Sequence, residues 1–387
     1  MNILFVINSL GSGGAEKIFM DLIKNFDCNR HKLTVLMIDK YVVYVDQIPD
    51  NITQKYIFRH ESKPWWKKKW YGAVSIIGRI FLRKGNAKRF YDKYITESYD
   101  VEIAFLEGEV TRLIAKSGNP HSVKYAWVHT DMLKNPWSEK CFPNQEEERN
   151  DYIAYDRVLA VSESVKDAFE EKFNLKAQVM YNALDEKEVF RRAEEFTCEK
   201  EKKETLRLIT VGRLVEVKGY DRLIKVFEKL SEKHKNLELI VVGNGEEKEK
   251  LEKLIRERAL GDVVHLYGYK KNPYPYIKSS DIFVCSSYAE GFSTVVTESL
   301  ILGIPVITTD CAGMKELLGE SQYGLIVENS ENGLFNGLTQ MIENKKLRKY
   351  YAEKALERGK EFCVKDRIQE IEEMINTDYQ KKIRENK

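Results

Sequence analysis

The sequence lacks the features of several protein classes. It contains no uninterrupted apolar run near the roughly 20 residues that a membrane-spanning helix requires. Its start, MNILFVINSL, has neither a basic region nor a small-residue cleavage site, so we expect no signal peptide. Six cysteines are scattered, with no C-x-x-C pair and no histidine at metal-ligand spacing. We therefore expect a reduced, cytoplasmic protein without a zinc site.

A large charge of one sign is also missing. The chain has 63 Lys and Arg against 61 Asp and Glu, a formal net charge of +2. This balance disfavours a strongly basic nucleic-acid binder, and we expect no nucleic-acid partner. The 387 residues exceed what one hydrophobic core usually organises, and the 43% of hydrophobic residues suffice for two cores.

Apolar runs of strand length alternate with helical patterns along both halves of the chain. Strands are expected at 2–7, 33–38, 101–105, 123–128 and 157–161, and again at 206–211, 237–242, 263–266, 281–285, 304–307 and 324–327. This alternation predicts an α/β protein with two doubly wound domains. We place the domains at 1–184 and 185–360, with a helix and tail at 361–387 that packs back toward the first domain. The charged stretch 191–205 is expected to form a linker.

The segment SSYAEGFSTVVTESLILGIPVITTD, 286–310, places a turn between a strand and a helix. Ligands of open α/β sheets bind at this carboxyl edge, and the amides of Gly291, Phe292, Ser293 and Thr294 at the helix start favour an anion. Glu290 and Glu298 then offer carboxylates to paired hydroxyls, as in sugars and riboses. The alternative is ordinary: Glu298 extends to solvent, and Glu290 is an acid near a helix N-terminus.

Two cations follow the first strand of the second domain. In TVGRLVEVKG, Arg213 and Lys218 lie on a strand-to-helix turn, where they are suited to clamp a diphosphate. By themselves they are equally compatible with solvated loop cations. The turn at HLYGY, with Tyr269, is a further strand end.

In combination these motifs resemble the retaining glycosyltransferase family 4 with the GT-B fold, over nearly the whole chain. The resemblance rests on E-G-F-S with a second glutamate at Glu290 and Glu298, on G-R-L…K-G at Arg213 and Lys218, and on G-x-G-G-A-E at 11–16. It implies two Rossmann-like domains that face a central cleft. It also implies a nucleotide-sugar donor held by the second domain and an acceptor held by the first.

The resemblance also implies a role for each matching residue. Glu298 binds the ribose hydroxyls, and Glu290 binds the transferred sugar. Arg213 and Lys218 hold the diphosphate, with help from the amides of 291–294, and the backbone near Tyr269 meets the base. Gly13 and Gly14 let the first-domain loop approach the diphosphate and the reacting sugar.

The first domain adds weaker candidates. Its glycine loop at 11–16 misses the dinucleotide fingerprint and the P-loop, which disfavours nicotinamide and ATP chemistry. His129 ends a strand in YAWVHTD, and the family often has a histidine here, near donor sugar and acceptor. Asp131 is a candidate on the acceptor side. A structural role for a lone histidine remains the alternative.

The segment 63–93 is unusually basic, with ten Lys and Arg and one acid, Asp92. Aromatic and apolar residues recur at helical spacing, interleaved with cations. Such a helix suits an anionic membrane surface, although it also suits an amphipathic helix packed on the domain. The candidates for acceptor or membrane contact in this segment are Trp65, Trp66, Trp70, Arg79, Arg83, Lys84 and Lys88.

The sequence thus predicts a cytoplasmic, peripherally membrane-bound enzyme that moves a sugar from a UDP-sugar to a lipid-linked glycan, a polyprenyl diphosphate acceptor of capsular, exopolysaccharide or O-antigen synthesis. His129, Glu290, Arg213 and Lys218 are the expected catalytic residues. We expect retention of configuration, no metal and no cofactor. Two alternatives stay open, namely a sugar-nucleotide epimerase of the same fold and a non-catalytic partner subunit.

Overall fold

The computed structural model describes residues 1–11, 13–39, 47–58, 76–198 and 204–386. The chain divides into two compact units, one formed by Met1–Ala183 with Val364–Lys387 and the other by Leu184–Cys363. The expected linker at 191–205 is wrong in its first residues. Helix α7 (Glu186–Ala193) belongs to the second unit, where it packs against α10 (Tyr274–Lys278) and buries Val189 and Ala193.

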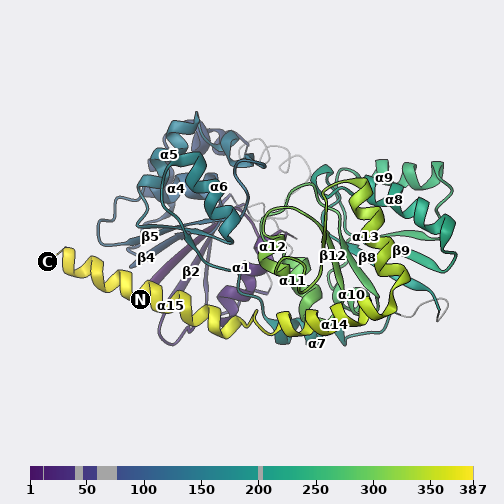
Figure 1. The fold of residues 1–387 in the computed structure, drawn as a ribbon. Helices are drawn as coiled ribbons and strands as arrows, with labels where there is room; N and C mark the ends of the chain where they lie inside the picture. The colour runs from purple at the N-terminus through teal and green to yellow at the C-terminus, as the bar shows by residue number, and fades with distance from the viewer. Residues whose placement is uncertain (12, 40–46, 59–75, 199–203, 387) are drawn as a thin grey trace. The chain divides into compact units, whose positions relative to one another are not determined.

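The first unit is built on a seven-stranded sheet in which all pairs are parallel (Figure 1). The strand order is β3-β2-β1-β4-β5-β6-β7. The strands are β1 (Asn2–Ile7), β2 (Lys32–Asp39), β3 (Thr53–Phe58), β4 (Val101–Ala104), β5 (Val123–Val128), β6 (Arg157–Ala160) and β7 (Gln178–Val179). The central strands are apolar along their length because helices cover both faces of a parallel sheet.

This unit contains the α-helices α1 (Gly14–Asn25), α3 (Ala87–Tyr94), α4 (Glu109–Ala115), α5 (Gln145–Ile153), α6 (Glu163–Phe173) and α15 (Val364–Glu385). Residues 76–84 are also helical, and η2 (Trp137–Cys141) is a short 3-10 helix. Helix α15 (yellow in Figure 1) returns the C-terminal residues to this unit, where it contacts α1 and β5. The Tyr125 hydroxyl donates to Asp378 at 2.8 Å, and the Tyr379 hydroxyl donates to Asp100 at 2.7 Å.

The second unit has a six-stranded parallel sheet in the order β10-β9-β8-β11-β12-β13. Its strands are β8 (Leu206–Val211), β9 (Leu237–Val242), β10 (Val264–Gly268), β11 (Ile282–Cys285), β12 (Val306–Thr309) and β13 (Leu325–Val327). Renumbered within the unit, this order is 3-2-1-4-5-6, that of a doubly wound nucleotide-binding fold.

Two groups of helices accompany this sheet. One group is α8 (Tyr220–Lys233), α9 (Lys248–Glu257) and α13 (Glu331–Glu343), and the other is α7, α10, α11 (Thr294–Ile301) and α14 (Lys345–Gly359). Helix α12 (Met314–Leu318) contacts β13. In α8, Leu223, Phe227 and Leu230 recur at three- and four-residue spacing and are fully buried, so the helix forms where its apolar face meets the sheet.

In both units the strand order reverses beside the first strand. In the second unit β8 lies between β9 and β11, and in the first unit β1 lies between β2 and β4. Connections leave toward opposite sides at such a switch point, which opens a crevice at the carboxyl ends of the two strands. The turns that follow β8 and β11 are therefore where the fold places a ligand in the second unit.

The expected α/β fold with two doubly wound units is confirmed. The expected strands occur within two residues of their predicted limits. Strands β3 and β7 were not predicted: β3 reads TQKYIF and is mostly half-buried, and β7 has only two residues, so neither shows a clear apolar pattern. Among the described residues, no helix is both long and apolar enough to cross a membrane.

Candidate active site

The candidate donor site lies at the switch point of the second unit. Arg213 and Lys218 follow β8, and Glu290 lies in the turn after β11, so the predicted cations and the first predicted carboxylate emerge at neighbouring strand ends. Tyr288 N donates to the carbonyl of Val217, which joins the two turns directly. The sequence motifs, more than 60 residues apart, thus form one surface.

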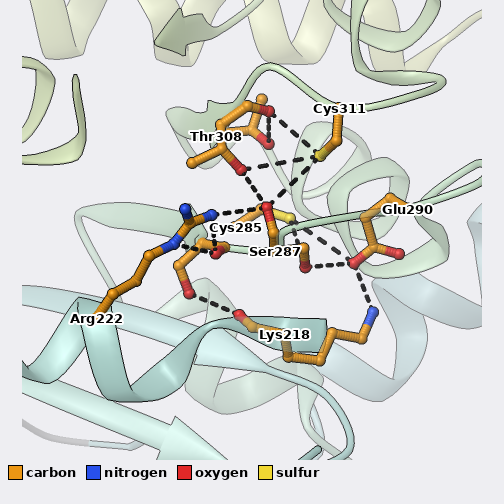
Figure 2. Close-up of polar contacts among 9 residues, drawn as sticks. Lys218, Arg222, Cys285, Ser287, Glu290, Thr308 and Cys311 are labelled. Atoms are coloured by element: carbon orange, nitrogen blue, oxygen red, sulfur yellow. Dashed lines mark hydrogen bonds and ion pairs between the residues drawn. The ribbon is translucent and has the colours of Figure 1, made fainter. Parts of the chain in front are cut away.

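Lys218 and Glu290 form an ion pair in which Lys218 Nζ donates to Glu290 Oε1 (Figure 2). The hydroxyl of Ser287 donates to the same oxygen at 2.6 Å. Burial opposes the charge of Lys218, but the Glu290 carboxylate outweighs it and raises the lysine pKa. Both side chains line a small pocket together with Cys285 and Ser287.

Arg213 differs from Lys218 in its surroundings. It is exposed, and no carboxylate of the described residues forms an ion pair with it. The side chain is close enough to Lys218 to oppose its protonation. Of these two cations, only Lys218 is paired with a carboxylate among the described residues. Positive charge is therefore available for an anionic ligand.

Glu298 is buried on α11 and does not extend to solvent, so the solvent alternative is wrong. Its Oε1 accepts a hydrogen bond of 3.0 Å from the hydroxyl of Tyr274 on α10. A carboxylate only 4% exposed within an apolar helix is costly unless it is bonded, and Tyr274 meets part of this need. The structure therefore fixes its orientation from a neighbouring helix.

The start of α11 is the helix end at which the sequence predicts an anion site. Ser293 is its N-cap and makes no side-chain cap bond, while Phe292 and Ser293 are buried and Gly291 and Thr294 are half-buried. The turn at Gly313, with φ of 75°, lies so close that an added Cβ would be 1.9 Å from the carbonyl oxygen of Gly291. Tyr269, the candidate near the base, follows β10 and is 44% exposed.

In the first unit, His129 follows β5 with its ring against Phe105 and Trp127. Burial lowers the pKa of His129 to about 3, so the ring is neutral at pH 7. Its Nε2 is buried and has no partner among the described residues. Asp131 caps its own turn, since Oδ1 accepts from the amides of Leu133 and Lys134.

Glu107, which follows β4, holds the backbone beside His129. Its Oε1 accepts from the amides of His129 at 2.6 Å and Thr130 at 2.7 Å, and from the Thr130 hydroxyl at 3.0 Å. Glu107 is fully buried, and this burial raises its pKa. Sequence reasoning missed this residue, which lies three positions after the end of β4, whereas His129 directly follows β5.

The glycine loop starts α1, with Gly13 as N-cap and Gly14 as the first helical residue. An added Cβ at Gly13 would lie 2.1 Å from Oε2 of Glu16, so the glutamate folds over the helix start. Gly14 is exposed. The loop therefore already carries a carboxylate at the helix end that anions prefer.

The basic segment is partly described. Trp65, Trp66 and Trp70 lie outside the described residues. In helix 76–84, Arg79 and Arg83 form ion pairs with Glu109, and Arg79 also pairs with Asp39. Lys84 and Lys88 are exposed, and Lys88 pairs with Asp92 at 2.9 Å.

Helix 76–84 also has exposed apolar side chains. Its exposed apolar residues are Ile76, Ile77, Ile80 and Phe81, between 52% and 62% exposed. Because Arg79 and Arg83 bind the helix to α4, the apolar side chains project from the unit. The structure thus gives this helix ion pairs with α4 and an exposed apolar surface.

Three residues of the donor site were also missed. They are Ser287, which contacts Glu290, Arg222, which contacts the turn after β11, and Tyr274, which contacts Glu298. Only Ser287, next to a predicted strand end, carried a signal in the sequence. No group of three or more His, Cys, Asp or Glu side chains within the described ranges is arranged to hold a metal ion.

Two doubly wound units in one chain are the architecture of the GT-B fold of glycosyltransferases, and the second unit has cations and a carboxylate at its switch point. The model of the family described as glycosyl transferases group 1 matches residues 191–358, which lie in the second unit. The resemblance to family 4 glycosyltransferases is thereby confirmed.

Similar proteins agree with this assignment. The chain is 29% identical over 371 residues to the Campylobacter jejuni N-acetylgalactosamine-N,N'-diacetylbacillosaminyl-diphospho-undecaprenol 4-alpha-N-acetylgalactosaminyltransferase, covering 92% of this chain and 94% of the relative. Among solved structures it is similar to Anabaena HepE in complex with UDP-glucose, with a TM-score of 0.75, 19% identity, and coverage of 97% and 100%. Sucrose-phosphate synthase from Thermosynechococcus elongatus gives a TM-score of 0.75 at 14% identity, with coverage of 98% and 99%. These structural likenesses show the fold.

Proposed function

We propose that this glycosyltransferase moves a sugar from a UDP-sugar to a hydroxyl group of a lipid-linked glycan, with retention of the anomeric configuration and without a metal ion. The observation that carries the proposal is the meeting of Arg213, Lys218 and Glu290 at the β8/β11 switch point. The named activity of the Campylobacter relative supports a polyprenyl diphosphate acceptor in surface polysaccharide synthesis. The UDP-glucose bound by HepE supports a UDP-sugar donor.

The roles of the residues follow from the chemistry. As the bond from the sugar C1 to the phosphate oxygen breaks, charge develops on the leaving diphosphate. Lys218 and Arg213 stabilise that charge. In other phosphate-transfer sites a divalent metal ion stabilises the leaving group in the same way. Glu290 accepts from a sugar hydroxyl, and Glu298 accepts from the ribose.

The leaving phosphate oxygen takes the proton of the acceptor hydroxyl while the new C1–O bond forms on the same face. No protein nucleophile is assigned. His129 is neutral at pH 7, so any role that it has in the reaction is that of an uncharged ring and not of a cation. Positioning and leaving-group stabilisation supply the rate enhancement.

Peripheral membrane attachment is part of the proposal. A lipid-linked acceptor stays in the membrane, and the exposed apolar residues of helix 76–84 lie beside exposed Lys84 and Lys88. Apolar side chains below the headgroups and cations over them are the pattern of an interfacial helix.

The first experiment is calorimetry with UDP and a panel of UDP-sugars, with EDTA present, on the wild type and Glu298→Ala. We expect binding without metal, and loss of a hydrogen bond to a charged group should weaken it by about 10- to 100-fold in the variant. Lack of any nucleotide binding by the wild type would contradict the proposal and favour a non-catalytic subunit.

The second experiment is transfer from the best donor to a polyprenyl diphosphate-linked saccharide, with the product anomer assigned by NMR. An α-linked product from an α-configured donor supports retention. Conversion of the donor to its epimer without an acceptor would support the epimerase alternative.

A further inference from the structure

Arg222 is a buried arginine that binds the turn carrying Glu290. It is 2% exposed and lies in the first turn of α8. Its Nε and Nη2 donate to the carbonyl of Ser286 at 2.9 and 2.5 Å, and Nη2 also donates to the carbonyl of Ser287 at 2.8 Å (Figure 2). Three hydrogen bonds from one planar group fix two consecutive peptide units at the end of β11.

The charge of Arg222 is not neutralised by a carboxylate among the described residues. Burial lowers the pKa of its guanidinium, which stays protonated because arginine loses its proton only in very basic solution. The guanidinium carbon lies 4.0 Å from the centre of the Tyr288 ring. A buried cation that bonds only carbonyls and an aromatic ring is costly for stability, so its place beside the site requires an explanation.

The two peptides that Arg222 holds are those that orient the site. The hydroxyl of Ser287 donates to Glu290 Oε1 at 2.6 Å, and the hydroxyl of Ser286 donates to the carbonyl of Lys218 at 2.9 Å. Thr309 adds a further donor to the Ser287 carbonyl at 2.6 Å. Movement of this turn would therefore shift the Glu290 carboxylate and the backbone of Lys218 together.

The close approach of α8 to this turn depends on Gly219. Its φ is 62°, and an added Cβ would lie 2.3 Å from the carbonyl oxygen of Ser286 and 2.9 Å from Nε of Arg222. A side chain here would displace the guanidinium from the carbonyls that it bonds. The helix start is thus shaped to bring Arg222 against the end of β11.

We infer that Arg222 is a positioning residue for Glu290, and that it sets how much the sugar contributes to donor affinity. This inference rests on the proposed function, in which Glu290 contacts the sugar and not the nucleotide. Loss of Arg222 should then reduce the preference for UDP-sugar over UDP, because the nucleotide contacts of Glu298 come from a different helix and a different partner, Tyr274.

The test compares Arg222→Met and Arg222→Lys with Arg207→Met. Arg207 is an equally buried arginine at the amino end of β8, where it bonds Glu238 at 2.8 Å, so its loss perturbs the same unit far along the strand from the site. Affinities for UDP and UDP-sugar, kcat and KM, and melting temperatures are measured for each variant.

In Arg222→Met we expect the ratio of UDP-sugar to UDP affinity to fall about tenfold, the value of one hydrogen bond to a charged group, with kcat reduced as well. Arg222→Lys should lose less of the affinity ratio than Arg222→Met, since lysine keeps a charged donor but lacks the planar group that bonds two carbonyls at once. Arg207→Met lowers the melting temperature and leaves the ratio unchanged.

Two outcomes would overturn the inference: an unchanged affinity ratio in Arg222→Met, including an equal loss for both ligands, or the same change of ratio in Arg207→Met. Ser287→Ala covers the case in which Arg222→Met fails to fold, because it removes the hydroxyl that donates to Glu290 and should lower the ratio in the same direction. If the wild type binds UDP and the variants leave the affinity ratio unchanged, only the inference about Arg222 is refuted. If the wild type binds no nucleotide, the proposed function is refuted.

Discussion

Lys218 Nζ donates to Oε1 of Glu290. The sequence predicts that Lys218 contacts the diphosphate of the sugar nucleotide and that Glu290 contacts its sugar, but in this structure the two side chains contact each other. The ammonium group has three hydrogens, and this bond uses one of them. A phosphate oxygen can therefore join the lysine without separating the pair. The ion pair holds Lys218 in place before the ligand arrives, which reduces the ordering cost of binding.

The first prediction follows from this pair. Lys218→Met should lower kcat by about 10²- to 10³-fold, because the charge that develops on the leaving diphosphate loses a preorganised cation. Initial rates with the preferred UDP-sugar measure the effect. Lys225→Met, on α8 and paired with Asp221, serves as control and should retain wild-type rates. A Lys218→Met enzyme with normal kcat would exclude a role in leaving-group stabilisation.

The second prediction concerns Arg213, which is exposed. Arg213→Ala should weaken UDP binding by about tenfold without lowering the melting temperature, since no described carboxylate depends on it. Calorimetry at low and high salt should show a weaker salt dependence in the variant. The matched control is Arg256→Ala, an exposed arginine on α9. Equal losses in both variants would point to general charge and not to a diphosphate contact.

The third prediction concerns Glu107. Glu107→Ala leaves the amides of His129 and Thr130 without their acceptor, which should reduce the free energy of unfolding by about 2–4 kcal/mol. Glu107→Gln keeps an acceptor oxygen and should lose less. Urea unfolding followed by tryptophan fluorescence, which includes Trp127, measures both. Equal losses in the two variants would show that the charge of Glu107, and not its acceptor oxygen, stabilises the turn.

The fourth prediction is a pH dependence. The pKa of His129 is about 3 in the folded protein against 6.5 when unfolded, so the unfolded chain binds the extra proton first as pH falls. The stability associated with a neutral His129 is complete above pH 6.5 and is lost progressively toward pH 3. About 1–2 kcal/mol should disappear between pH 6.5 and about pH 5.

Melting curves of the wild type and His129→Gln across this pH range provide the test. The difference between the two proteins should shrink as pH falls, because the glutamine has no proton to gain. Buried Glu107, whose pKa is raised by burial, is present in both proteins and cancels in the difference. A difference independent of pH would mean that His129 titrates normally.

The fifth prediction tests the membrane proposal. Ile77→Asp or Phe81→Asp should reduce flotation with vesicles that contain anionic lipid, because a carboxylate replaces an apolar contact and opposes the lipid charge. Ile153→Asp is the control, since Ile153 on α5 is 54% exposed, as is Ile77. Flotation that all three variants retain equally would assign helix 76–84 a packing role only.

Sequence reasoning predicted the fold well where periodicity is strong. The strands at 2–7, 206–211 and 237–242 are mostly apolar, and they occur at their predicted limits. Strand β3, with its polar sequence, has no such pattern, because an edge strand is only partly buried and its side chains face mixed surroundings. The sequence placed a domain boundary at residue 184 and a linker at 191–205, and helix α7 occupies the first residues of that linker, because charge marks solvent exposure and not the end of a unit.

By itself, the sequence determined which chemistry is available at the strand ends: Arg213 and Lys218 after one strand, Glu290 and Glu298 around a second turn. Motif and spacing are local properties, and the strand-turn-helix pattern places such residues at the carboxyl edge. Only the tertiary structure decided which of these residues meet. The pairing of Lys218 with Glu290, the bond from Tyr274 to Glu298 and the clamp of Arg222 all join segments distant along the chain, and their geometry depends on parallel strand order and helix packing that no local pattern encodes.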